Sequence, residues 1–273
     1  MRMIADLSRI RRLLRPLLPQ PAAYLLRHRQ LVWLLARRDV ASRTSGTLLG
    51  GLWMLIQPAL QVVALWFLLD IVLKVRFPGL RGGFVAYYLT GMIPWLMMNE
   101  IIQRSLSVLT EFAVIYQRAV FPLGILPLVP LFVTGGIYMV IYVVVGSILA
   151  GAHGGAGAAL LIALLLLWLL PFCYLLAVLG LFVRDLQQVA PFVLTMFLYV
   201  TPILYLPAAL PPSLHWWLLI NPFAHLMAMA HGLVQGQGSI LRAIIYPAVL
   251  WIIFVFPSLS LYRRSQPHMR EAL

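Results

Sequence analysis

The stretch VFPLGILPLVP, residues 120–130, places three prolines within nine positions of an otherwise apolar region. Proline inside a helix removes a backbone hydrogen bond and clashes with the preceding turn, so it favours a helix start or a bend. The charged segment TEFAVIYQRA, residues 110–119, lies directly before it. We therefore predict that an apolar helix enters a membrane here, next to a polar segment outside the bilayer.

The composition indicates a membrane protein. Of the 273 residues, 63% are hydrophobic and 10% are charged, whereas soluble domains carry about 25% charged residues. A single soluble core could not bury so much apolar surface. The net charge of +13 does not indicate nucleic acid binding, because ten of the twenty basic residues precede residue 50 and no Asp, Glu, Lys or Arg occurs in residues 186–241. Basic residues on one side of apolar spans instead indicate orientation and attraction to anionic lipids.

We predict an all-α membrane protein with six transmembrane helices, an N-terminal interfacial helix and two short re-entrant helices. Residues 1–50 form a cytoplasmic and interfacial segment, in which LVWLLA (31–36) is too short to span the bilayer. The six spans lie within residues 51–262, and residues 263–273 form a cytoplasmic tail. The expected spans are 52–73, 84–102, 121–150, 160–183, 189–205 and 244–261, with GAHGGAGAA (151–159) as a tight turn between the third and fourth.

Two apolar pieces lie between the fifth and sixth spans. SLHWWLLI begins with Ser213 and NPFAHLMAMAHGLV begins with Asn221, and both residue types are good helix N-caps. Pro222 suits the first position of a helix. Each piece is shorter than the ~20 residues that cross a bilayer, so we expect both, over about residues 212–234, to enter the membrane and return.

The charges near the predicted helix ends indicate both pairing and topology. Asp70 and Lys74 are four residues apart at the end of the first span, and Glu100 and Arg104 have the same spacing at the end of the second. This spacing favours ion pairs within a helix. Six spans place both termini on one side, where sixteen of the twenty Lys and Arg residues then lie. The termini are therefore expected in the cytoplasm.

The residues that would indicate an enzyme are not found together in the sequence. The two closest acidic residues, Glu100 and Glu111, are too far apart to form a local carboxylate pair or metal site. The single cysteine, Cys173, can form neither an intrachain disulfide nor a zinc site. A phosphate-binding loop needs Gly-Lys followed by Ser or Thr, whereas Leu73 precedes the single lysine. We therefore expect no cofactor in this chain, and any ATP hydrolysis must occur in another chain.

Several motifs occur in a fixed order along nearly the whole chain: RRDVASRTSGTLLGGLWMLIQP (37–58), GMIPW (91–95), FPLGILPL (121–128), FVRDLQQVAPFVL (182–194), TPILY (201–205), LPPSLHWWLLINPF (210–223) and YRRSQP (262–267). Each is weak alone, but together they resemble the type-2 ABC-transporter permeases that export polysaccharides such as O-antigen, capsule and teichoic acid. Two positions depart from the family. Thr44 and Ser45 replace an aromatic–basic pair that often follows Arg43, and Gly124 stands where the family often has Glu.

The resemblance implies a homodimer in the bacterial inner membrane, with two ATPase subunits that bind ATP and Mg on its cytoplasmic face. The segment 110–119 would relay movement of the ATPase to the membrane helices. The candidate coupling residues are Arg37, Arg38, Asp39, Arg43, Glu111, Tyr116 and Arg118.

Aromatic side chains offer surfaces on which sugars stack without fixed charge. The candidates that would line a channel for a lipid-linked polysaccharide are Trp53, Trp66, Phe67, Phe192, Phe197, Tyr199 and Tyr205. The candidates for an outer gate or interfacial belt are Tyr87, Tyr88, Trp216 and Trp217. The alternatives are a type-2 ABC permease for a drug or small lipid, a membrane-embedded polyprenyl-phosphate glycosyltransferase, and a passive channel.

Overall fold

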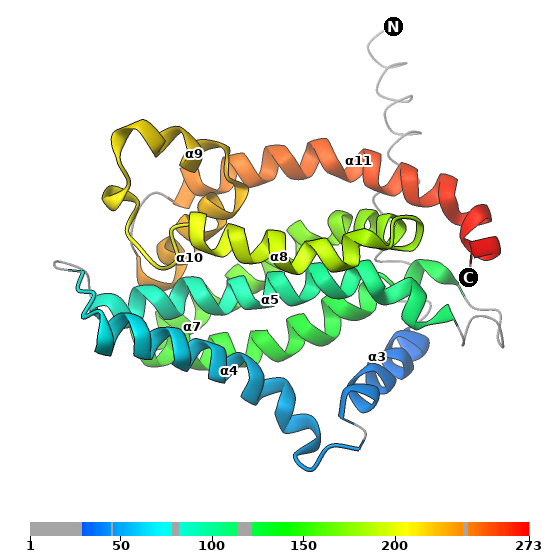
Figure 1. Ribbon diagram of the computed structural model, residues 1–273, viewed down its shortest axis with the longest axis horizontal. Coiled ribbons are helices and arrows are strands. Elements are labelled where there is room, and N and C mark those ends of the chain that lie inside the picture. Colours follow the sequence, from blue (N-terminus) through cyan, green and yellow to red (C-terminus); the bar gives the residue numbers. More distant parts are fainter. Residues whose placement is uncertain (1–28, 45, 78–81, 114–121, 237–239, 273) are drawn as a thin grey trace, which may run out of the picture.

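The computed structural model describes residues 29–44, 46–77, 82–113, 122–236 and 240–272, and the regular structure in these ranges is helical, as predicted (Figure 1). Two long helices, α5 (Gly83–Glu111) and α7 (Leu128–Phe182), pack along each other at the centre of the bundle. The other helices of at least 14 residues are α3 (Arg29–Thr44), α4 (Trp53–Trp66), α8 (Asp185–Val200), α10 (Pro222–Gln235) and α11 (Ile240–Ala272). The short elements are η1 (Gly50–Leu52), η2 (Phe67–Val72), η3 (Leu123–Ile125), η4 (Pro207–Ala209), η5 (Pro212–Leu214) and α9 (His215–Ile220).

The proline-rich stretch starts a helix, as predicted. Pro122 precedes the 3₁₀ turn η3, and Pro127 occupies the N-cap position of α7. Pro130 lies in the first turn of α7, where backbone N–H groups have no partner inside the helix. The three prolines therefore direct the chain into α7 without breaking its hydrogen bonds.

Helix α7 contains a sharp reversal that joins the third and fourth expected spans. Ala150 and Gly151 have non-helical backbone angles, and the φ of Gly151 is 63°, which favours glycine. The observed turn is shorter than the predicted one, which covered residues 151–159, because the chain is helical again by Gly154. A Cβ atom on Gly154 would lie 2.2 Å from the carbonyl oxygen of Gly146. The glycines therefore allow the two arms of α7 to touch through their backbones.

Buried side chains form two clusters that leave one face of the bundle uncovered. One cluster joins α5, the middle of α7 and α10, and the other joins α3, the last turns of α5, both ends of α7 and the end of α11. In contrast, α4 has no buried residue, and α8 has only Leu194 and Leu198. Figure 1 shows α4 and α8 on either side of α5. Much of their surface therefore lacks a partner among the described residues of this chain.

Three helical segments in the described ranges are long and apolar enough to cross a membrane: Gly50–Val72, Leu123–Phe182 and Ile244–Met269. A bent pair, Pro212–Ile220 with Pro222–Gln235, gives a fourth if it counts as one span. The chain is thus a multi-pass membrane protein. The six-span count stays a prediction. The two arms of α7 count as one segment here, α5 is less apolar than these segments, and α8, with 16 residues, is shorter than they are.

The bent pair has one predicted cap and lacks the other. The two helices meet at an angle of 87°. At the start of α10, Asn221 accepts a hydrogen bond from the backbone N–H of Phe223 at 3.0 Å, which confirms this cap. The predicted cap at Ser213 is wrong, because Ser213 lies inside the 3₁₀ turn η5 and Leu214 precedes α9.

Two details at the ends of the predicted spans also differ from expectation. Asp70 forms its ion pair with Arg76 at 2.6 Å, so the predicted Lys74 partner is wrong. The reason is that the helix ends before Lys74, whose φ is 50°. At the other end of the chain, α11 continues past the expected limit of the sixth span, so the predicted tail is helical up to Ala272.

Candidate functional site

Four charged side chains form a cluster between α3 and α5. Asp39 is 3% exposed and accepts hydrogen bonds from Arg43 at 2.9 Å and from Arg104. Arg43 also donates to Glu100 at 2.7 Å. From α7, the hydroxyl of Thr134 donates to the same Glu100 carboxylate at 3.1 Å. Alternating charges therefore connect α3 and α5, and one hydroxyl adds α7.

The partners in this cluster differ from those that sequence spacing predicts. Glu100 and Arg104 lie one turn apart on α5, but the structure pairs Glu100 with Arg43 and Arg104 with Asp39. A carboxylate removed from water needs hydrogen bonds to replace those of the solvent, and Asp39 obtains donors from two helices. Burial raises the pKa of the Asp39 carboxyl, and the charge and hydrogen bond of Arg43 oppose that shift.

A cavity of about 400 Å³ adjoins the cluster, between α3, α4, α5 and α7. Arg43, Glu100 and Arg104 form part of its wall, and Trp53 and Tyr138 add aromatic surface. The remaining polar lining consists of four amide side chains, which both donate and accept hydrogen bonds: Gln57, Gln61, Asn99 and Gln103. Amides beside aromatic rings can bind hydroxyl-rich molecules by hydrogen bonding and stacking.

Three of the predicted channel aromatics lie on α4 or at the start of η2. Trp53 is exposed and lines the polar cavity. Phe67 is also exposed, whereas Trp66 is half-buried and packs against the core. Of these three, only Trp53 lies at the cavity beside the charged cluster.

The other predicted channel aromatics lie on α8 or shortly after it. Phe192 and Tyr199 are exposed. Phe197 is half-buried and stacks with Trp217, with ring centroids 6.2 Å apart. Tyr205 donates a hydrogen bond to a backbone carbonyl at the end of α8 at 2.9 Å. Among the described residues, no ring contact joins an aromatic of α4 to one of α8, so a single chain does not form a continuous aromatic wall.

The four gate candidates divide into a buried pair and a more exposed pair. Tyr87 and Tyr88 are buried in α5, which keeps both out of a lipid-facing belt. The Tyr87 hydroxyl donates to a backbone carbonyl after α8 at 2.9 Å, and its ring stacks on His231 at 4.0 Å. Trp216 is exposed, and Trp217 is half-buried and donates to the end of α8 at 3.1 Å. A gate function for these residues stays a prediction.

The coupling candidates on α3 have two different environments. Arg37 and Arg38 are exposed on this helix. Asp39 and Arg43 instead point to α5, where they form the ion pairs of the charged cluster. Any contribution of Asp39 and Arg43 to coupling would therefore act through the position of α3 relative to α5.

The remaining coupling candidates lie at or after the end of α5. Glu111 is exposed and accepts a hydrogen bond from Ser107. Tyr116 and Arg118 lie outside the described residues. The predicted coupling role of this segment therefore stays a prediction.

Two residues not predicted from the sequence connect α5 to the turn between α7 and α8. The Gln187 side chain donates to the backbone carbonyls of Leu106 at 3.1 Å and Gly180 at 3.0 Å. A Cβ atom on Gly180 would lie 1.9 Å from the Leu106 carbonyl oxygen. A lone glycine in an apolar helix is a sequence signal for close packing, but it does not identify the partner.

Comparison with known proteins identifies the family of the chain. Residues 30–234 match the family described as ABC-2 type transporter. The O-antigen export system permease protein RfbA of Klebsiella pneumoniae is 24% identical over 249 residues, which are 89% of this chain and 95% of that protein. The corresponding RfbA of Myxococcus xanthus is 23% identical over 241 residues, with 83% and 91% covered.

A third relative has a different named cargo. The polysialic acid transport protein KpsM of Escherichia coli is 23% identical over 240 residues, which are 85% of this chain and 92% of that protein. Each of these relatives is aligned over most of its length, so the similarity is not limited to one motif. With the family match covering well over half of its residues, the chain belongs to the ABC-2 type transporter family.

Proposed function

We propose that this chain is the membrane-spanning subunit of an ATP-driven exporter that moves a lipid-linked polysaccharide, such as O-antigen, across the bacterial inner membrane. The observation that carries the proposal is the similarity to O-antigen and polysialic acid transport proteins along most of both chains. Both named cargoes are polysaccharides, which favours this class over drugs or small lipids. The cavity with its amides and aromatic rings has the chemistry that such a cargo requires.

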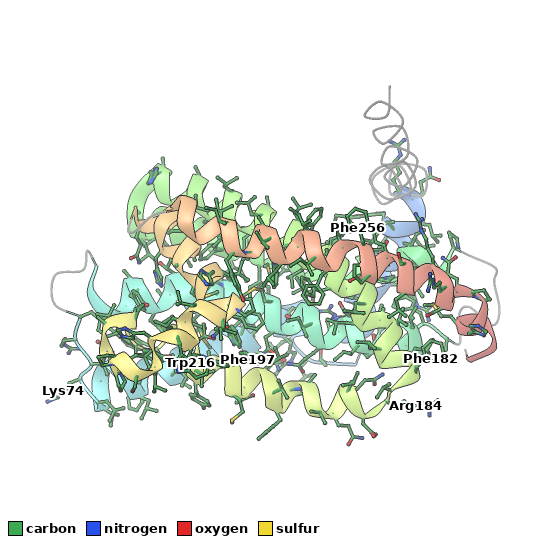
Figure 2. The ribbon with its side chains drawn as sticks, turned by 90° about the horizontal axis from the view of Figure 1, so that it is seen from above. Lys74, Phe182, Arg184, Phe197, Trp216 and Phe256 are labelled. Carbon is green, nitrogen blue, oxygen red and sulfur yellow. The ribbon has the colours of Figure 1, made fainter. Side chains whose placement is uncertain are left out.

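The proposed topology has six crossings with both termini in the cytoplasm. The crossings are Gly50–Val72, α5, the two arms of α7, α8 and α11. Figure 2 shows Lys74 and Arg184 at opposite ends of the long axis, as this topology requires. Arg184 lies on the predicted cytoplasmic side with most of the basic residues. The bent pair α9–α10 then enters from the outer side and returns.

The proposed channel forms between two copies of the chain. The poorly buried helices α4 and α8 leave a face of one copy uncovered, and this supports a second copy as its partner. Trp53, Phe192 and Tyr199 are exposed on these helices, so they are available to a sliding sugar polymer. Energy comes from ATP and Mg bound by two separate ATPase subunits at the cytoplasmic ends of the helices.

The test is to delete the gene in its host and locate the surface polysaccharide. We expect polymer of normal chemistry to accumulate in the cytoplasm on its lipid anchor, because synthesis continues while export fails. The wild-type gene should restore surface polymer. Export by the variant Phe192→Ala is then compared with export by a control variant, Val144→Ala. Both side chains are exposed, but only Phe192 is assigned to the channel.

The alternatives give different results in the same experiment. Normal surface polymer in a strain without a second exporter would contradict polysaccharide export by this chain. Absence of polymer from every compartment, with the synthesis genes still expressed, would favour an enzyme of polymer synthesis. Equal loss of export in Phe192→Ala and Val144→Ala would contradict the assignment of the α8 face to the channel.

A further inference from the structure

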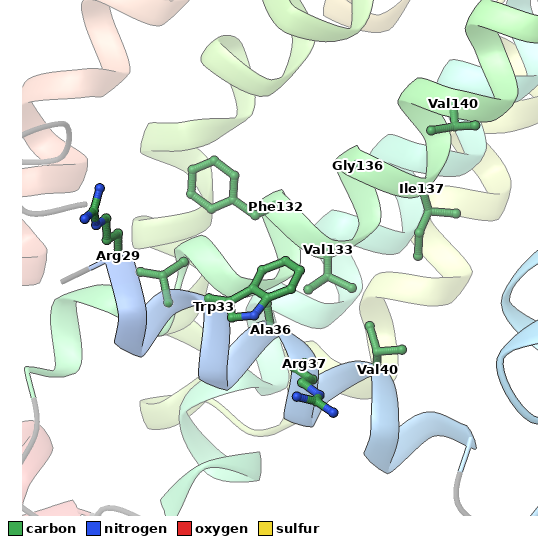
Figure 3. A pocket seen from close by; sticks show the side chains of 11 residues that line it. Arg29, Trp33, Ala36, Arg37, Val40, Phe132, Val133, Gly136, Ile137 and Val140 are labelled. Carbon is green, nitrogen blue, oxygen red and sulfur yellow. The ribbon is translucent and has the colours of Figure 1, made fainter. Parts of the chain in front are cut away.

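An apolar groove lies between α3 and the first arm of α7, and none of its described lining residues also lines the polar cavity. Its volume is about 850 Å³, within the range of roughly 300–1,000 Å³ typical of ligand pockets. Figure 3 shows Trp33 from α3 facing Phe132 and Val133 from α7 across this groove. The groove is open, since Trp33 is 72% exposed.

Two charged residues from the described part of the chain line the groove, and both are basic. Arg29 and Arg37 line it from the α3 side, and both are exposed. In Figure 3, Val140 lies farther along α7, away from these two arginines. Among the described residues, no acidic residue lines the groove, and Asp39 on the same helix is already paired with Arg43 and Arg104. The groove therefore combines an apolar body with positive charge on one side.

We infer that this groove binds an anionic phospholipid of the membrane, with its headgroup at the α3 side, where Arg29 and Arg37 provide positive charge, and an acyl chain along α7. The charge pattern matches an amphiphile with a negative head and an apolar tail. A tryptophan beside the arginines is typical of a side chain at headgroup level. This goes beyond the proposed function, because the phospholipid is a bound component of the permease and is not its cargo.

Such a lipid would stabilise the position of α3. The groove has one wall from each helix, so a bound chain adds apolar contacts between α3 and α7. On another side of α3, Asp39 and Arg43 fix this helix to α5. Occupancy of the groove is therefore expected to stabilise the charged cluster as well as α3 itself.

Gly136 provides a direct test of where the lipid binds. It lines the groove, and a Cβ atom built on it would meet no other atom within 4 Å. The first atom of a leucine side chain at this position would therefore lie in open space, from which the rest of the side chain extends into the groove. The added side chain competes with the acyl chain for the same space, whatever the headgroup.

The experiment titrates the purified full chain with phosphatidylglycerol or phosphatidylcholine of identical acyl chains and counts bound lipids by native mass spectrometry. We expect phosphatidylglycerol to bind more tightly to the wild type. The double variant Arg29→Gln/Arg37→Gln should bind it about 30-fold more weakly, from roughly 1 kcal/mol for each basic residue. Gly136→Leu should lose binding of both lipids, whereas the control Arg264→Gln should retain it.

A second measurement does not depend on the Gly136 variant. Phosphatidylglycerol with brominated acyl chains should quench the fluorescence of Trp33, measured as the difference between the wild type and Trp33→Phe. Equal binding of the two lipids, full binding by Gly136→Leu, or no quenching of Trp33 would each overturn the inference. Displacement by a polyprenyl diphosphate at equal concentration would assign the groove to a cargo anchor and would also overturn it. No measurement uses export, so failure here is distinct from failure of the proposed function.

Discussion

Replacing Arg104 by methionine is expected to lower the free energy of unfolding by about 3 kcal/mol, because it removes one of the two arginine partners of a buried carboxylate. Asp39 is 3% exposed and the Arg104 side chain is 16% exposed, so water screens this pair weakly. Methionine retains much of the apolar stem of arginine, and the main change is the loss of the charge and its hydrogen bonds.

The matched control is Arg76→Met, which removes the partner of Asp70. Its pair has an N–O distance of 2.6 Å, but Arg76 is 64% exposed. Exposed ion pairs contribute about 0–1 kcal/mol, so this variant should lose less than about 1 kcal/mol. Burial, and not the mere presence of an ion pair, accounts for the expected difference between the two variants.

The assay is unfolding of the full chain in mixed micelles by increasing sodium dodecyl sulfate, followed by circular dichroism. A double-mutant cycle with Asp39→Asn should give a coupling energy of at least about 1 kcal/mol, because the two side chains are in contact. Equal losses for Arg104→Met and Arg76→Met would refute the reasoning, as would additive effects of Asp39→Asn and Arg104→Met.

Gly180→Ala should destabilise the chain by about 1–3 kcal/mol in the same assay, because the new methyl group overlaps a backbone carbonyl of α5; Gly136→Ala, which has open space, should be neutral or slightly stabilising. Asn221→Ala should cost about 1–2 kcal/mol, since this side chain caps α10 and also donates to a buried threonine at 3.0 Å. Glu111→Ala should reduce export at unchanged protein level, measured as surface polysaccharide against an immunoblot; full export would contradict its coupling role.

Much of the helical architecture could be predicted from local patterns. The apolar runs, the prolines at 122, 127 and 130, and the Asn-Pro pair at 221–222 each have a direct physical effect on helix starts. The reversal in α7 was expected near its glycines, but its position was not, because a glycine suits both a turn and a close helix contact. Gly154 forms a close helix contact, but the sequence pattern around it would be the same if it formed a turn.

The charged cluster was only partly predictable. Asp39 and Arg43 were singled out by the resemblance, and their spacing is consistent with the contact on α3. The bonds from Arg43 to Glu100 and from Arg104 to Asp39 depend on how α3 docks on α5. Spacing along one helix describes local neighbours only, so it favoured a Glu100–Arg104 pair that the structure does not contain. Burial of Asp39 determines which side chains form ion pairs, and this burial exists only once the helices have packed together.

The charged cluster also has a consequence for biogenesis. Arg43 precedes its partner Glu100 by 57 residues, which a ribosome adds in roughly 3–11 s at about 5–20 residues per second. During this delay Arg43, on the same helix, is the one cluster arginine available to Asp39, and a carboxylate without its full set of hydrogen bonds is costly to bury, so α3 is expected to stay at the water-exposed membrane surface. The docking of α3 therefore reports that the second predicted span has been inserted in the correct orientation. A chain in which this span is inverted would keep α3 undocked, and would present a recognisable target to membrane quality-control proteases.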